Sequence, residues 1–317
     1  MAMLHKRILG AIAALGMLAA ASSAGAFKLG IIAFQMSAET HARCSNSAAE
    51  AAKKLGWTVQ QLNSEGSLPK HAEQIETMIQ ARVDGLILCM GKPIEAEAQF
   101  ADVKKAGIPL VTVVSGTSPH SMFDIQVNDY VGGAQATMYL LSKMNYKGEI
   151  LTARFEQNVA SRIRGKELDV ILSENPSVKV IGSHSMARTA SWRDDVRNGM
   201  QALILQNKGK FQGVWASWDG QAWIIDDLLR AQGMKKGDVI MVSVDGGEES
   251  YRRIKDPASL FTATVAIPFE SMGQMAVDAL DKIVVKKMPR DKVVSGPYMW
   301  VDAVLVDASN VDKFIGK

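Results

Sequence analysis

Side chains with ligand-binding chemistry lie in the second half of the chain. Asp245 ends an apolar run and is followed by Gly246 and Gly247, which allow the backbone to turn tightly. A carboxylate at this position can accept two hydroxyl hydrogen bonds at once, and its charge strengthens both. Capping of a following helix is the competing role. We expect Asp245 to contact a small polar ligand.

Tryptophan is concentrated in the same region of a protein that is only 6% aromatic. An indole face stacks on the CH face of a sugar or polyol, and it also attracts quaternary ammonium groups. Trp215 and Trp223 fall inside a predicted strand and a predicted helix, where core packing accounts for them. Trp192 and Trp218 fall at predicted loop positions and are the candidates for ligand contact.

The elements that must position these side chains alternate along the chain. Apolar runs predict strands at residues 29–34, 85–90, 110–114, 149–153, 178–182, 213–216, 239–244 and 261–267. Stretches with helical spacing lie between them, for example at residues 45–55 and 222–231. Strands of this kind, separated by helices, indicate an α/β fold with parallel sheets covered on both faces. Ligands of such sheets bind beyond the carboxyl ends of the strands, where Asp245 stands.

The first 26 residues have the layout of a secretory signal peptide. Lys6 and Arg7 precede an apolar stretch at residues 8–21, and the small residues 24–26 suit a cleavage site. The stretch is short for a membrane span, and no Cys follows it to carry a lipid. We expect a soluble protein, exported to the periplasm, whose mature chain begins near Phe27.

Length and charge exclude several classes of protein. Residues 27–317 exceed the usual size of one compact core, so two lobes are expected. The 36 basic and 33 acidic side chains nearly cancel, and two of the basic ones belong to the leader. No positive field remains for nucleic acid or an anionic membrane. An export signal also occupies the place where a repressor would carry its helix-turn-helix.

The sequence offers little that would support catalysis or metal binding. The histidines are scattered, and no Cys/His cluster has zinc spacing. No Gly-x-Ser-x-Gly elbow occurs, and the Gly246-Gly247 pair lacks the spacing of a nucleotide-binding loop. We therefore expect no enzyme activity, no metal and no cofactor. Cys44 and Cys89 either form one disulfide or remain two buried thiols.

Six short segments together resemble the ribose-binding-protein type of periplasmic solute-binding proteins. They occur in that family's order, at residues 28–32, 83–88, 106–111, 128–133, 162–165 and 244–246. The resemblance implies two Rossmann-like lobes with parallel sheets, joined by three crossover strands, with the ligand held between them. It places lobe one at residues 27–127 plus 266–294 and lobe two at residues 128–265 plus 295–317. It also implies a monomer that delivers its solute to an ABC permease in the inner membrane.

The same resemblance points to individual contacts. Arg162 matches the family's ligand-binding Arg, which leaves a structural role for Arg164, and Ser115 stands where sugar binders carry an Asp-Arg pair. Trp218 with Asp219 stands where the family often has Asn-Asp. The complete set of candidate ligand-binding residues is Glu39, Thr40, His41, Met90, Ser115, Arg162, Trp192, Trp218, Asp219 and Asp245.

The expected ligand is a small polyhydroxylated solute, namely a sugar, a sugar alcohol or a close derivative. The alternative is a receptor that reports to a sensor kinase or chemoreceptor, with room for a methylated amine beside the tryptophans. In a fold of this kind the third strand lies beside the first. We therefore predict a Cys44–Cys89 disulfide, because the first helix begins where the first strand ends.

Overall fold

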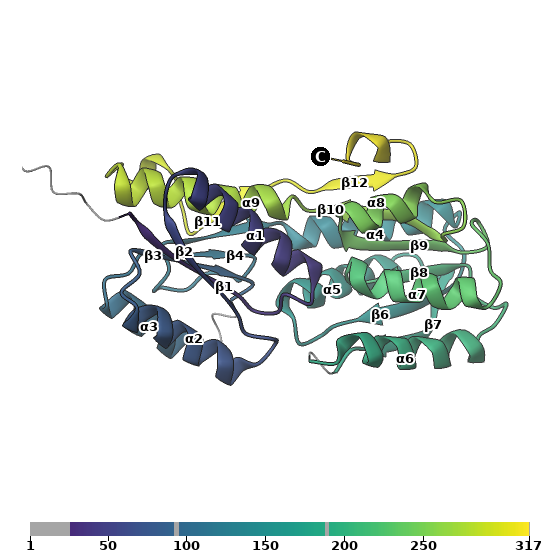
Figure 1. Ribbon diagram of the computed structural model, residues 1–317. Helices are drawn as coiled ribbons and strands as arrows, with labels where there is room; N and C mark the ends of the chain where they lie inside the picture. The colour runs from purple at the N-terminus through teal and green to yellow at the C-terminus, as the bar shows by residue number, and fades with distance from the viewer. Residues whose placement is uncertain (1–25, 92–94, 188–189, 317) are drawn as a thin grey trace, which may run out of the picture.

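Two six-stranded sheets, each sandwiched between helices, make up the molecule (Figure 1). The computed structural model describes residues 26–91, 95–187 and 190–316. The expected export signal therefore lies outside the described residues, apart from Ala26. No helix within the described ranges is long and apolar enough to cross a membrane. The predicted α/β fold with two parallel sheets is confirmed.

The first lobe is built around a sheet in the order β11-β5-β4-β3-β1-β2, in which every neighbouring pair is parallel. Its elements are β1 (Lys28–Ala33), α1 (Glu39–Lys54), β2 (Thr58–Asn63), α2 (Leu68–Gln80), β3 (Gly85–Cys89), α3 (Glu97–Lys105), β4 (Leu110–Val113), β5 (Phe123–Val127), α9 (Phe269–Leu280) and β11 (Tyr298–Val301). Helices α1 and α9 cover one face of this sheet, and α2 and α3 cover the other (Figure 1).

The second lobe repeats this plan in the order β12-β10-β9-β8-β6-β7, with only β12 antiparallel to its neighbour. Its elements are α4 (Asp129–Lys143), β6 (Gly148–Arg154), α5 (Val159–Ser173), β7 (Val178–Ser185), α6 (Trp192–Gln206), β8 (Gly213–Ala216), α7 (Asp219–Ala231), β9 (Ile240–Asp245), α8 (Glu248–Lys255), β10 (Phe261–Ala266) and β12 (Val304–Asp307). Short helical turns lie at Asp281–Val285, Arg290–Lys292 and Val311–Lys313.

Successive residues of the central strands pack into different cores. On β1, Ile31 belongs to the core beneath α1 and α9, whereas Ile32 belongs to the core beneath α2 and α3. On β3, Ile87 and Leu88 divide in the same way, and all four side chains are fully buried. Because side chains alternate across a strand, burial on both faces requires the continuous apolar runs seen in the sequence.

Within residues 26–316, as far as the structure describes them, the chain passes between the lobes three times: from β5 to α4, from β10 to α9 and from β11 to β12. We refer to these three crossings together as the hinge. The expected assignment of residues 295–317 to lobe two is wrong for β11, which pairs with β5 in the first sheet. The third crossing thus falls between Val301 and Val304, because β11 completes the edge of lobe one before the chain leaves it.

The predicted Cys44–Cys89 disulfide is confirmed, with its two Cα atoms 6.3 Å apart. Cys89 ends β3, and its pairing partner in β1 is Ala33, just before the loop that leads into α1. One turn into that helix, Cys44 faces the sheet and is fully buried. The bond therefore joins the first helix to the centre of the first sheet.

Candidate functional site

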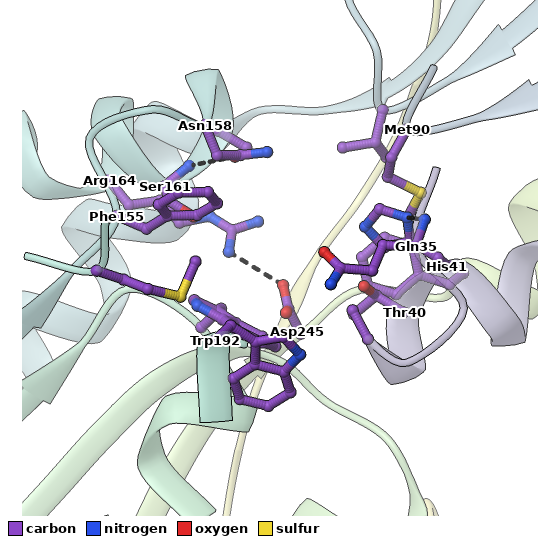
Figure 2. Close-up of a pocket in the computed structure, with 16 residues that line it drawn as sticks. Gln35, Thr40, His41, Met90, Phe155, Asn158, Ser161, Arg164, Trp192 and Asp245 are labelled. Atoms are coloured by element: carbon purple, nitrogen blue, oxygen red, sulfur yellow. Dashed lines mark hydrogen bonds and ion pairs between the residues drawn. The ribbon is translucent and has the colours of Figure 1, made fainter. Parts of the chain in front are cut away.

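A cavity with an empty volume of about 580 Å³ lies between the lobes, beyond the carboxyl ends of β1, β3, β6 and β9. Figure 2 shows residues of the two lobes facing each other across it. The side chains that line the cavity are Gln35, Ala38, Thr40, His41, Met90, Val114, Phe155, Asn158, Ala160, Ser161, Arg164, Met186, Trp192, Trp218, Asp245 and Phe269. This mixture of aromatic walls and a few polar groups is typical of a small-molecule site.

The polar side chains on the first-lobe side of the cavity are Gln35, Thr40 and His41. Gln35 follows β1, and Thr40 and His41 lie in the first turn of α1. His41 Nδ1 accepts a hydrogen bond from the backbone N–H of Gln35 at 3.0 Å. This bond holds the imidazole in the tautomer whose proton is on Nε2, so the ring carries a donor in its neutral form.

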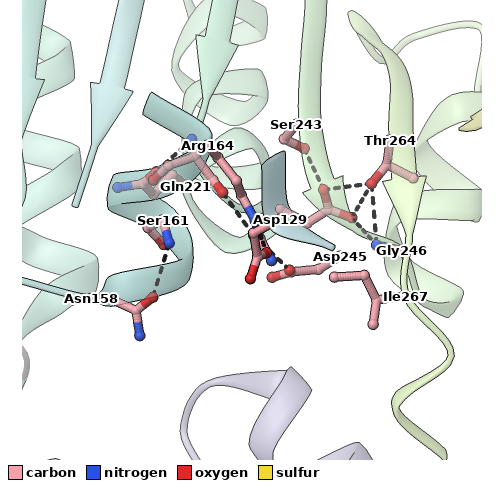
Figure 3. Close-up of polar contacts among 12 residues, drawn as sticks. Asp129, Asn158, Ser161, Arg164, Gln221, Ser243, Asp245, Gly246, Thr264 and Ile267 are labelled. Carbon is pink, nitrogen blue, oxygen red and sulfur yellow. Dashed lines mark hydrogen bonds and ion pairs between the residues drawn. The ribbon is translucent and has the colours of Figure 1, made fainter. Parts of the chain in front are cut away.

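The second lobe contributes a buried ionic cluster built on Arg164 (Figure 3). Its Nε donates to Asp129 Oδ1 at 2.9 Å, and its Nη1 donates to Asp245 Oδ1 and to the Ser217 carbonyl, both at 3.0 Å. Gly133 makes this geometry possible, because a Cβ atom there would lie 2.7 Å from the Cα atom of Arg164. The close contact of α4 with α5 places the guanidinium at the cavity wall.

Asp245 ends β9 with a φ of 136°, an unfavourable backbone conformation for a residue with a side chain. Burial raises the pKa of its carboxyl to about 7, Arg164 opposes this shift, and the nearby carboxylate of Asp219 reinforces it. The Asp245 carboxyl lies between Arg164 and the first-lobe residues in Figure 2. The cavity thus presents a fixed donor beside an acceptor that is easily protonated.

Two indoles form the floor of the cavity on the second-lobe side. The rings of Trp192 and Trp218 pack with their centroids 4.5 Å apart and their planes at 55°. The indole N–H of Trp218 is buried and has no hydrogen-bond acceptor among the described residues. A buried donor without a partner is costly, so an acceptor supplied by a ligand would stabilise the site.

Six of the predicted site residues line this cavity, namely Thr40, His41, Met90, Trp192, Trp218 and Asp245. Four of the predicted residues do not. Ser115 lines a neighbouring cavity, where its hydroxyl accepts a hydrogen bond from Gly91 N at 2.6 Å. Glu39 lies beside Arg43 and opposite Gly247 of the second lobe.

The expectation for Arg162 and Arg164 is reversed by the structure. Arg162 donates to the carbonyl of Glu156 at 2.5 Å and lies outside the cavity, whereas Arg164 lines it. The physical reason is helical geometry, because residues two apart on a helix point in nearly opposite directions.

Asp219 is also placed differently from the expectation. Its carboxylate is fully buried and accepts hydrogen bonds from the hydroxyls of Ser243, Ser250 and Thr264 and from Gly246 N. All four donors come from the second lobe itself. Asp219 therefore supports the loop that follows Asp245 and has no direct place on the cavity wall.

Several lining residues were missed in the sequence, among them Gln35, Phe155, Asn158, Ser161 and Phe269. Asn158 is the clearest case. It caps α5 by accepting a hydrogen bond from Ser161 N at 3.0 Å, and its amide nitrogen points across the cavity (Figure 2). A capping residue after a predicted strand was an available signal, because strand ends and helix starts meet at this edge of the sheet.

Fold and site together define a two-lobed solute-binding protein. Residues 14–288 match the family described as periplasmic binding protein domain, and this chain belongs to that family. A xylitol-binding protein of Mycolicibacterium smegmatis is 26% identical over 274 residues, covering 80% of this chain and 72% of that protein.

Solved structures show the same fold. An ABC sugar transporter subunit of Rhodobacter sphaeroides has a TM-score of 0.78 at 22% identity, covering 90% of this chain and 99% of that one. A solute-binding protein of an ABC transporter from Agrobacterium vitis, solved with bound allitol, has a TM-score of 0.77 at 22% identity. That alignment covers 91% of this chain and 97% of the other.

Proposed function

We propose that this protein binds a small polyhydroxylated solute, a sugar or sugar alcohol, and delivers it to an ABC permease. The observation that carries this proposal is the pairing of Arg164 with Asp245 on a cavity wall shared with Trp192 and Trp218. The Nε and Nη1 groups of Arg164 already donate to protein acceptors, so Nη2 donates to the ligand. A carboxylate accepts from ligand hydroxyls, and indole faces cover the CH groups between them. The names of the related proteins agree with this chemistry.

The remaining parts of the proposal follow from the family. The protein acts outside the cytoplasm as a monomer, residues 1–26 direct its export, and it changes no covalent bond of its ligand. The solute shifts the population toward the closed arrangement of the two lobes, which the permease recognises. Recovery of a chemically altered ligand after incubation would contradict this binding role.

A thermal-shift screen tests the ligand class. Pentitols, hexitols, pentoses, hexoses, sugar acids and the methylated amines glycine betaine and choline would each be added to the purified protein. We expect at least one polyol or sugar to raise the melting temperature in a concentration-dependent manner, because binding to the folded form stabilises it by mass action. A rise with methylated amines alone would overturn the proposal.

A matched pair of arginine variants tests the site with the best ligand from that screen. Arg164→Lys keeps the charge but loses the planar fork, so we expect affinity to fall about tenfold, corresponding to about 1.4 kcal/mol. Arg162→Lys lies two residues away and outside the cavity, so its affinity should stay within about twofold of the wild type. Isothermal titration calorimetry measures both, and unchanged affinity in Arg164→Lys would contradict the assignment.

A further inference from the structure

A second cavity adjoins the candidate site on the side of the hinge. It has an empty volume of about 1160 Å³ and shares four lining residues with the first cavity, namely Met90, Val114, Asn158 and Ala160. Its other walls come from the first crossing, at Gln126 to Asn128, and from β11, just before the third crossing. The two cavities therefore adjoin each other along these four residues.

The far wall of this second cavity is aromatic. Tyr298 and Trp300 project from the same side of β11, because they are two residues apart on a strand, and their ring centroids lie 4.8 Å apart. Trp300 is 58% exposed, and Tyr130, at the start of α4, is 57% exposed. All three residues line the cavity.

The position of these rings favours an occupant that is linked to the primary ligand. Tyr298 and Trp300 belong to the first lobe, whereas Tyr130 and Asn158 belong to the second. An occupant that touches both walls stabilises the same closed arrangement as the primary ligand. A sugar ring suits the space, because its CH face stacks on an indole while its hydroxyls meet the amide groups of Gln126, Asn128 and Asn158.

We propose that this second cavity is a subsite for a glycosyl unit attached to the polyol or sugar in the first cavity. Trp300 is its stacking platform, and Asn158 lies on the wall that the two units share. The protein then accepts glycosides in addition to single polyols. This inference rests on the proposed function. It adds that the ligand can consist of two linked units.

Paired ligands and calorimetry test the subsite. Each single polyol is compared with its glycosides. Glucitol is paired with its glucoside maltitol and its galactoside lactitol, and xylitol is paired with its xyloside xylobiitol. We expect at least one glycoside to bind, and we expect Trp300→Ala to weaken that glycoside about tenfold while single polyols change less than about twofold. Trp300→Phe should restore most of the loss, since it returns an aromatic face.

Controls separate stacking from folding. Tyr146→Ala removes an exposed aromatic ring that lines neither cavity, so it should change no affinity. Tyr130→Ala tests the opposite wall of the same cavity if Trp300→Ala fails to fold. It should weaken the glycoside in the same selective way, because its ring also faces the subsite.

Each contrary result has a distinct meaning. Binding of single polyols without any glycoside overturns the subsite but leaves the proposed function in place. Failure of every polyol and sugar to bind removes the proposed function itself. Equal glycoside affinity in wild type and Trp300→Ala also overturns the subsite. Loss of uptake in Trp300→Ala with both affinities unchanged would identify this surface as a contact for the membrane partner instead.

Discussion

At the scale of single residues, the site depends on the guanidinium of Arg164, which pairs with more than one buried carboxyl group. Arg164 faces the carboxylates of Asp129 and Asp245, and Asp219 lies close behind Asp245. Burial is the main cause of the raised pKa of about 7 at Asp245, and the nearby Asp219 carboxylate adds to it, whereas Arg164 and Arg43 oppose it.

The first prediction concerns the pH dependence of ligand affinity. Below about pH 7 the free protein carries a protonated Asp245, which accepts hydroxyl hydrogen bonds less strongly than the carboxylate. Ligand binding should favour the ionised form of Asp245. The affinity for the ligand should therefore increase with pH and be about tenfold higher at pH 8 than at pH 6. Asp245→Asn cannot ionise and should bind weakly with a flat profile. Parallel profiles for the two proteins in calorimetry would contradict this role.

At the scale of elements, α1 serves three functions at successive positions. Its first turn presents Thr40 and His41 to the cavity, and Cys44 ties it to β3. Between them, Arg43 pairs with Glu270 at 2.6 Å and donates to the carbonyl of Gly246 in the second lobe at 2.8 Å. The helix therefore links the ligand site, the hinge and the core of lobe one, because its side chains point in different directions.

The second prediction concerns the disulfide that anchors this helix. Loss of the Cys44–Cys89 bond should lower the free energy of unfolding by about 2–4 kcal/mol, because the open chain gains conformational freedom when it unfolds. Reductant should shift the denaturation midpoint of the wild type but leave that of the Cys44→Ala/Cys89→Ala double variant unchanged. Two reactive thiols in denatured, unreduced wild type would show that the bond is absent.

At the scale of the whole molecule, contacts between the lobes favour closure. Arg193 of α6 stacks over Trp192 with 4.2 Å between the guanidinium carbon and the ring centroid, and its Nη2 donates to the Ser37 carbonyl of lobe one at 3.0 Å. Arg43 makes the comparable contact near the hinge. Because these bonds exist only when the lobes approach, they bias the population that the ligand selects.

The third prediction addresses this closure contact. Arg193→Ala should weaken ligand affinity about threefold to tenfold, mainly through faster dissociation, because about 1 kcal/mol of closed-state stabilisation is lost. Arg197→Ala changes an exposed arginine one turn further along α6 and serves as the control. Stopped-flow dissociation rates and small-angle scattering of both variants measure the effect. Identical dissociation rates in the two variants would exclude Arg193 as a closure contact.

Much of the fold was predictable because its central strands are buried on both faces. The apolar runs near residues 29–34, 85–90 and 213–216 correspond closely to β1, β3 and β8. The edge strands β2, β11 and β12 were not predicted, since all three are partly exposed, β2 carries several polar residues, and β11 and β12 are only four residues long. The unpredicted β11 also explains why the third crossing was placed too early.

By itself, the sequence determined the α/β architecture and the chemistry available at the strand ends, including Trp218 and Asp245. Only the tertiary structure decided which groups face the cavity. It turned Arg164 inward and Arg162 outward, and it enclosed Asp219 among hydroxyl donors. The local sequence pattern indicates the type of secondary structure and the chemistry of each side chain. The direction in which a side chain finally points depends on packing between helices that are distant in sequence, as the contact of Gly133 with Arg164 shows.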